Sequence, residues 1–184
     1  MTLATLDAPV RVLFEQLDQY NGPVPDMDGI GRILVEFAED TEYLQHHIDR
    51  IRDKSGAAPI HCPERGPRLQ IVHRLTGQMG AIHSHKVWIA ATPVEGTETH
   101  RLYGVRGSGV TLKEETHLAP GQFVTLTPPN DVHAHGHVQG IGDAAYCLIF
   151  AGDDQRRFER EEYDAKTGAM RTLPVGDGGA WVAS

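Results

Sequence analysis

The first third of the chain has its apolar residues at helical spacing. Residues 8–20 are predicted to form an amphipathic helix that Asn21-Gly22-Pro23 ends, and a second helix is predicted to begin at Asp26 or Asp28. This second helix either runs on or restarts near Asp40-Thr41. We interpret the aspartates as helix caps, because the other ligand positions of a calcium loop are missing. The apolar stripes comprise Val10, Leu13, Phe14 and Leu17, then Ile30, Ile33, Leu34 and Phe37, then Tyr43, Leu44, Ile48 and Ile51.

From Arg68 onward the pattern changes to short β-type runs separated by turns that contain glycine or proline. Because no helical pattern lies between the runs, they predict an all-β sandwich or barrel. The predicted strands lie near Leu69–Leu75, Ala81–Thr92, Thr97–Val105, Gly109–Thr116, Gln122–Thr127, His133–His137 and Ala144–Ala151. A hairpin turn is predicted at Gly104–Gly109, and the charged stretch from Asp153 contains a predicted turn at Thr167-Gly168.

The two patterns divide the chain into predicted parts. Residues 1–53 form a helical extension packed on the barrel, residues 68–173 form a single β-barrel domain, and residues 174–184 form a tail. The stretch from Lys54 to Pro67 is rich in proline, glycine and charge, so we interpret it as the linker between helices and barrel.

Composition narrows the classes of function. The 184 residues carry a net charge of -8, which argues against a nucleic-acid or anionic-membrane partner because no basic surface is provided. No apolar run is long enough to span a membrane and no leader pattern is seen, so we expect a cytoplasmic protein, either a monomer or a homodimer. The two cysteines, Cys62 in a loop and Cys147 in a β-run, offer no disulfide framework, and we assign neither a catalytic role.

The candidate chemistry lies in two histidine motifs. In an extended strand alternate side chains share a face, so His83 and His85 are predicted to point to one spot, with Val87 and Ile89 as apolar neighbours. A tight turn at Pro128–Asp131 can return His133 to the same level, and three imidazoles would then hold one face of a metal ion. The alternative is a chance pair in a histidine-rich chain. Neutral imidazole suits iron, copper, zinc and nickel, and open positions on the ion are typical of a catalytic site.

The other histidines receive different interpretations. His135 and His137 share a face with His133, so either can replace it, assist it or lie at a solvated edge. His73 is expected to be packed or hydrogen-bonded. The remaining ones have no paired spacing or are expected to be solvated: His46, His47, His61, His100 and His117.

These motifs resemble the cupin superfamily. Its first motif corresponds to Gly77 or Gly80, then His83-Ser84-His85, then Gly96; its second corresponds to Gly121, then Pro128–His133, with Asn130 in place of a glycine. The usual glutamate of the first motif would fall near Ile89 or Ala90 and is absent. In this respect the sequence resembles one branch of the superfamily, the small-thiol dioxygenases such as cysteine dioxygenase and 3-mercaptopropionate dioxygenase. Further likeness lies in Glu95–Glu98, Tyr103, and Tyr163-Asp164 followed by Thr167-Gly168.

The resemblance implies a cupin double-stranded β-helix, a jelly-roll barrel, with an N-terminal helical extension. It also implies Fe(II) held by His83, His85 and His133, with Zn, Ni or Mn as other possible metals, and the oxidation of a small thiol by O2 to its sulfinate. Tyr103 and Tyr146, with Trp88 as an alternative, are the candidates for a polar group that contacts the substrate.

Two features depart from that family. Its Ser-x-His-x-Tyr relay would fall on Tyr146–Phe150, where Leu148 and Phe150 replace the histidine and tyrosine. The arginine that would bind a substrate carboxylate is Arg65, Arg68 or Arg74, and the sequence does not choose among them. Two other classes of function therefore stay open. One is a hydrolase, lyase or isomerase that uses Zn, Ni or Mn at the same site, and the other is a non-catalytic cupin that binds a small ligand. The substrate is a small thiol or another small acid.

Overall fold

The computed structural model describes residues 6–20, 22, 24–107 and 109–176. Three helices come first: α1 (Ala8–Leu17), α2 (Met27–Ala38) and α3 (Thr41–Asp49). The Asp26 side chain accepts a hydrogen bond from the Gly29 amide, and the Asp40 side chain accepts one from the Tyr43 amide. These caps begin α2 and α3, so the capping interpretation of Asp26 and the predicted restart near Asp40 are confirmed. The predicted stop of the first helix includes Asn21 and Pro23, which lie outside the described residues.

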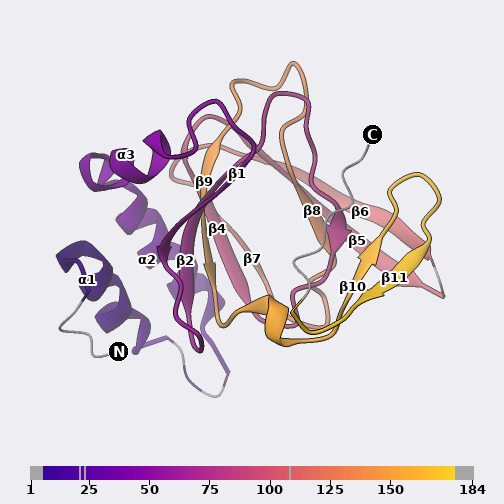
Figure 1. The fold of residues 1–184 in the computed structure, drawn as a ribbon, viewed down its shortest axis with the longest axis horizontal. Coiled ribbons are helices and arrows are strands. Elements are labelled where there is room, and N and C mark those ends of the chain that lie inside the picture. Colours follow the sequence, from indigo (N-terminus) through magenta and orange to yellow (C-terminus); the bar gives the residue numbers. More distant parts are fainter. Residues whose placement is uncertain (1–5, 21, 23, 108, 177–184) are drawn as a thin grey trace.

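Eleven strands follow in the described part of the chain and form two antiparallel sheets. One sheet has the order β1-β2-β9-β4-β7 and the other the order β11-β10-β3-β8-β5-β6. Figure 1 shows the helices on the outer side of the first sheet and the second sheet across from it. The bounds are β1 Gly56–His61, β2 Arg68–His73, β3 Ile82–His83, β4 Ile89–Glu95, β5 Glu98–Arg106, β6 Gly109–Leu118, β7 Val124–Leu126, β8 His133–Gly136, β9 Tyr146–Ala151, β10 Arg160–Tyr163 and β11 Met170–Leu173.

One face of the five-stranded sheet packs against the helices, and the other faces the second sheet. Leu148 and Phe150 of β9 point to the helices and pack in one core with Leu13 and Leu34, whereas Cys147 and Ile149 point between the sheets. Full burial of each such leucine contributes about 1.5–3 kcal/mol, so the helical extension is held by the same residues that form the back of the sheet. The predicted fold class, mainly β in two facing sheets with an N-terminal helical extension, is confirmed.

The structure differs from the strand prediction in three places. The linker predicted over 54–67 contains β1, which pairs antiparallel with β2. The composition was misleading because β1 is an edge strand, and an edge tolerates Pro59, whose nitrogen cannot donate to a ladder. The charged C-terminal stretch forms the hairpin of β10 and β11, and its turn lies at the predicted Thr167-Gly168.

The third correction concerns the first histidine motif. The single strand predicted over Ala81–Thr92 is two strands in different sheets, β3 and β4. Lys86 has a φ of 62°, a left-handed conformation that no strand interior adopts, and it turns the chain from one sheet to the other. Val87 consequently does not continue the alternation that His83 begins. A sequence of β-type residues gave no sign of this turn, because lysine has no preference for it.

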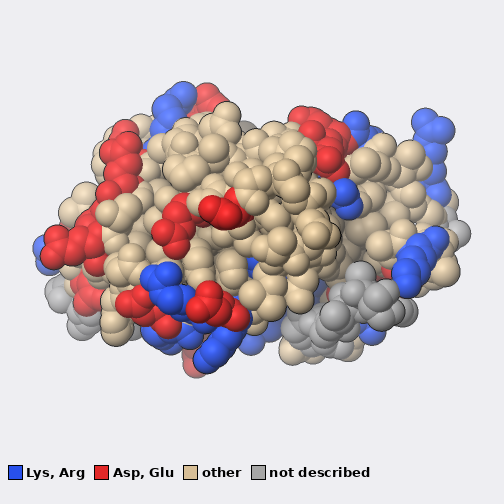
Figure 2. All heavy atoms as spheres, turned by 90° about the horizontal axis from the view of Figure 1, so that it is seen from above, with Lys and Arg blue, Asp and Glu red and all other residues tan. Residues whose placement is uncertain are grey.

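The surface carries both signs of charge. On the face seen in Figure 2, acidic and basic side chains lie in separate small groups and form no continuous basic surface. None of the helices in the described residues is long and apolar enough to cross a membrane.

Candidate metal centre

The structure brings His83, His85 and His133 together. β3 and β8 are neighbouring antiparallel strands, and His83 and His133 are directly opposite each other in their register. His85 lies two residues beyond His83, just after the end of β3. One ring nitrogen of each histidine lies within 4.8 Å of the corresponding atoms of the other two. The three side chains therefore form a group that can hold a metal ion.

Backbone carbonyls orient two of the rings. His83 Nδ1 lies 2.9 Å from the Ala81 oxygen, and His133 Nδ1 lies 3.1 Å from the Asp131 oxygen. A carbonyl can only accept, so each Nδ1 carries the proton and each Nε2 keeps its lone pair. His133 Nε2 is buried and has no hydrogen-bond partner among the described residues. These are the tautomers that metal-binding histidines adopt.

The distance between His83 Nε2 and His85 Nε2 is 2.9 Å. Two imidazole nitrogens that bind one ion at right angles, each about 2.1 Å from it, would be about 3.0 Å apart. The separation therefore fits two nitrogens that bind the same ion. Without an ion, the same contact requires a proton between the two atoms, and metal binding would displace that proton.

Burial keeps these rings neutral. It lowers the pKa of His83 to about 4, and it lowers the pKa values of His85 and His133 well below the usual 6.5, with the neighbouring histidines adding to the effect on both. The neutral ring is the form that binds a metal ion, so the group is ready to bind at neutral pH.

Asp131 holds the first motif in place. Its Oδ2 accepts hydrogen bonds from the amides of His85, at 2.7 Å, and Lys86, at 2.9 Å, and its side chain is buried. A buried carboxylate thus fixes the turn at which the chain leaves β3. Asp131 belongs to the second histidine motif. Its two hydrogen bonds therefore hold the two motifs together independently of any ion that they share.

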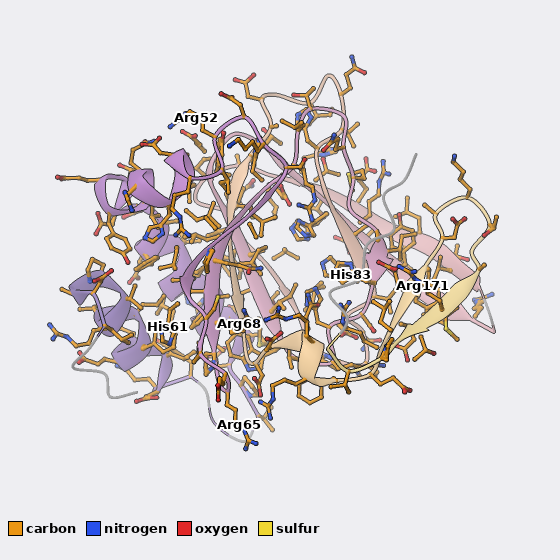
Figure 3. The ribbon with its side chains drawn as sticks, in the orientation of Figure 1. Arg52, His61, Arg65, Arg68, His83 and Arg171 are labelled. Carbon is orange, nitrogen blue, oxygen red and sulfur yellow. The ribbon has the colours of Figure 1, made fainter. Side chains whose placement is uncertain are left out.

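A cavity of about 660 Å³ lies between the two sheets, with the three histidines in its wall. Val72, Ile89 and Ile149 supply apolar surface. The polar residues in its wall include Gln70, Arg74, Gln155, Arg160 and Glu162. In Figure 3 His83 lies between the sheets, whereas Arg65 projects from the lower edge of the molecule. Of the three arginines considered from the sequence, Arg74 is the one in this cavity.

A second group, which sequence reasoning missed, lies beside the three histidines, and its member His135 is in the cavity wall. Glu98, His100 and His135 are all buried, and their ligand atoms lie within 4.8 Å of one another. The sequence did not show that His100 lies next to His135, because the two residues are brought together by the register of β5 with β8. The alternation of Glu98 and His100 in a predicted strand was the one available signal.

The tyrosines proposed to contact substrate lie elsewhere. Tyr146 points to the helical side of its sheet, stacks on His73 at 4.1 Å between ring centroids, and accepts a hydrogen bond from the Asp53 amide. Tyr103 packs against the cluster of Ile82, Val132, Ala134 and Tyr163. Neither residue lines the cavity. Trp88 packs edge-on against Phe150, also on the helical side. Period-two alternation identifies two faces of a strand but does not tell which is inside.

The remaining histidines have structural contacts. His73 is packed and hydrogen-bonded to the Ala145 carbonyl, as predicted. His137 accepts a hydrogen bond from the Gly77 amide through Nδ1 and donates one through Nε2 to the Ile141 carbonyl. Both ring nitrogens thus have partners, and the ring is buried and not at a solvated edge. His47 is buried on α3 and His61 is half-buried on β1 against Phe14, which corrects the expectation that both are solvated.

The two cysteines differ in burial. Cys147 is fully buried, and burial raises the pKa of its thiol well above the usual value. A thiol that stays protonated is a poor nucleophile. Cys62 is half-buried, with its sulfur 3.7 Å from the Leu69 oxygen.

No protein-family model matches the sequence, and no curated protein matches it. Solved structures with a similar chain path include a conserved protein with a double-stranded β-helix domain from Klebsiella pneumoniae, with 13% identity and a TM-score of 0.44 over 68% of this chain and 93% of that one. An RmlC-like cupin from Methanocaldococcus jannaschii has 13% identity and a TM-score of 0.42 over 57% and 87%. The polyketide cyclase RemF from Streptomyces resistomycificus has 16% identity and a TM-score of 0.41 over 54% and 66%. These likenesses concern the fold alone.

Proposed function

We propose that the protein is a mononuclear non-haem Fe(II) dioxygenase of the cupin type, which oxidises a small thiol to its sulfinate. The observation that carries the proposal is the composition of the group formed by His83, His85 and His133: three neutral imidazoles and no carboxylate. The position at which cupins usually place a glutamate falls near Ile89 or Ala90, both buried and apolar, and Ile89 lies in the cavity wall. When bound, ferrous iron would supply the redox centre for the reaction with O2.

The charge of this group favours an anionic substrate. Three neutral ligands leave the two positive charges of the ion uncompensated, and a thiolate adds the missing negative charge. The reaction is balanced without another reductant: a thiol and O2 give a sulfinic acid, both oxygen atoms form bonds to sulfur, and the sulfur loses the four electrons that O2 gains. Val72, Ile89 and Ile149 limit water around the reacting sulfur.

The arginines of the cavity favour a thiol with an acidic tail. Arg74 and Arg160 both line it, and Arg160 is fully buried. A guanidinium can bind a carboxylate through two parallel hydrogen bonds. We therefore expect the substrate to be a small mercapto acid, oriented by Arg74.

Oxygen uptake by anaerobically iron-loaded protein tests the proposal. Cysteine, 3-mercaptopropionate and cysteamine are supplied in turn, and sulfinate is measured by mass spectrometry. We expect stoichiometric uptake with a mercapto acid. Arg74→Gln should raise KM for that thiol at least tenfold and leave KM for cysteamine, which has no carboxylate, unchanged. Arg65→Gln, an exposed position outside the cavity, is the matched control. Absence of uptake from fully loaded protein with every thiol would refute thiol oxidation.

A second candidate is a hydrolase, lyase or isomerase that uses Zn, Ni or Mn at the same three histidines. The observation in its favour is that His135, which lines the same cavity, has its Nδ1 2.6 Å from Glu98 Oε1. A histidine oriented by a carboxylate is a common general base. Turnover with Zn under anaerobic conditions would support this candidate, because thiol oxidation requires both iron and O2.

A further inference from the structure

The buried group of Glu98, His100 and His135 has an unusual number of unsatisfied polar atoms. Neither His100 Nδ1 nor His100 Nε2 has a hydrogen-bond partner among the described residues, and the side chain is only 5% exposed. A neutral imidazole has one donor and one acceptor, and leaving such a group buried without partners costs about 1–3 kcal/mol. The fold therefore keeps a destabilising side chain in its interior, beside a carboxylate and another histidine.

The three side chains are held close together by the sheet. His100 and His135 are opposite each other on β5 and β8, and their rings stack at 5.5 Å between centroids. Glu98 lies two residues before His100 and so shares its face of β5. Its Oε1 is 2.6 Å from His135 Nδ1 and 3.9 Å from His100 Nε2. One oxygen and two nitrogens thus converge from two adjacent strands.

We propose that Glu98, His100 and His135 form a second site for a divalent transition-metal ion, distinct from the group of His83, His85 and His133. Two imidazoles and one carboxylate are a donor set that binds Fe(II), Zn(II) and Mn(II). An ion here satisfies the buried nitrogen of His100 and replaces the proton between His135 and Glu98. The negative charge of Glu98 would compensate part of the ion's positive charge, and the first group has no such carboxylate.

The two sites are adjacent, and this sets their relative affinities. His100 stacks on His133 at 5.8 Å between ring centroids, so one ligand of each site is in contact with the other. Two dications at such close range repel each other in a poorly hydrated interior. The second ion to bind is therefore held more weakly than the first, and emptying either site strengthens binding at the other.

Metal counting tests this proposal independently of any activity. Metal-free protein is titrated with Co(II), followed by its visible absorption and by mass spectrometry of the intact chain under native conditions. We expect two ions per chain for the wild type, bound in two steps, and one ion for His83→Ala. His100→Phe, which keeps a ring of similar size, should also bind one ion. The variant with both changes should bind none.

The controls separate lost ligation from lost folding. Glu98→Gln keeps the shape of its side chain and should reduce affinity for one ion at least tenfold while circular dichroism and melting stay close to wild type. His117→Gln changes a histidine of the neighbouring strand β6 that belongs to neither group, and it should keep both ions. A wild-type protein that saturates at one ion, or a His100→Phe variant that binds as many ions as wild type, would overturn the second site. Thiol oxidation by a one-ion protein is compatible with the proposed function, so the two hypotheses fail separately.

Discussion

His83 and His133 are directly opposite each other on β3 and β8, and their ring centroids are 4.8 Å apart. Two residues that are 50 positions apart in the chain thereby each provide one candidate metal ligand, from neighbouring strands. β3 itself has two residues, Ile82 and His83, so the ladder between β3 and β8 is short. The position of the first motif depends on groups beyond the ladder, above all on Asp131.

Removing a proposed ligand should empty the first site. We expect His83→Ala to lower the iron affinity of the first site at least 100-fold while circular dichroism still reports a folded β protein, since the ring that is lost is only half-buried. His137→Ala is the matched control: it removes a buried histidine with hydrogen bonds to Gly77 and Ile141, so it should lower stability by about 1–3 kcal/mol and keep the iron. Equilibrium dialysis of both variants in a His100→Phe background, in which the proposed second site cannot bind, measures the iron of the first site alone. The opposite pattern would mean that the second motif binds through His137.

Asp131 should affect metal binding without touching the ion. Asp131→Ala removes the acceptor for the amides of His85 and Lys86, which frees the turn between β3 and β4. We expect a 10- to 100-fold loss of metal affinity, the usual effect of removing a group that orients a ligand. Asp131→Asn keeps one acceptor oxygen and should lose less. Equal affinity in Asp131→Ala and wild type, by competition with a chromophoric chelator, would show that the turn is fixed by other contacts.

The metal-free protein should become more stable as pH rises from about 4.5 to 6.5. Burial lowers the pKa of His83 to about 4 and those of His100 and His135 to about 3, whereas unfolded histidine titrates near 6.5. In this range the unfolded chain binds more protons, and stability increases with pH. Glu98 acts oppositely, because burial raises its pKa to about 7 and its folded-state stabilisation is lost as pH rises toward that value.

Three histidines outweigh one glutamate in this balance. The free energy of unfolding, from urea titrations with a chelator at pH 5, 6 and 7, should therefore rise by about 1.4 kcal/mol or more per pH unit between 5 and 6. His100→Phe should show a smaller slope. A flat profile would mean that water reaches these rings and that they titrate as in the unfolded chain.

Tyr146 should be structural. Its hydroxyl accepts a hydrogen bond from the Asp53 amide on the helical side of the sheet. Tyr146→Phe should therefore lower the free energy of unfolding by about 1 kcal/mol and leave kcat and KM for the thiol unchanged. Tyr103→Phe, which changes a second tyrosine outside the cavity, provides a comparison. A large fall in kcat for Tyr146→Phe at unchanged stability would restore the role that the sequence suggested.

The amino-acid sequence alone determined the local features of this protein. Apolar spacing located the helical part of the chain and left open whether the second helix runs on or restarts at Asp40. Asp26 was identified as a helix cap, because spacing and capping both depend on neighbours within four residues. Alternation brought His83 and His85 into one candidate site with His133, and the structure places these three rings together. Turn residues located most of the strands for the same local reason.

Tertiary structure decided what depends on distant residues. The left-handed turn at Lys86 is held by the two hydrogen bonds that Asp131 accepts from backbone amides there. No residue of the first histidine motif indicates this turn. The register of β5 with β8 brings His100 to His135, and strand spacing along the chain carries no information about register. The packing of α2 against its sheet turned Tyr146, Leu148 and Phe150 outward, away from the cavity. Long-range pairing and the choice of the buried face are properties of the assembled sheets, so only the folded molecule shows them.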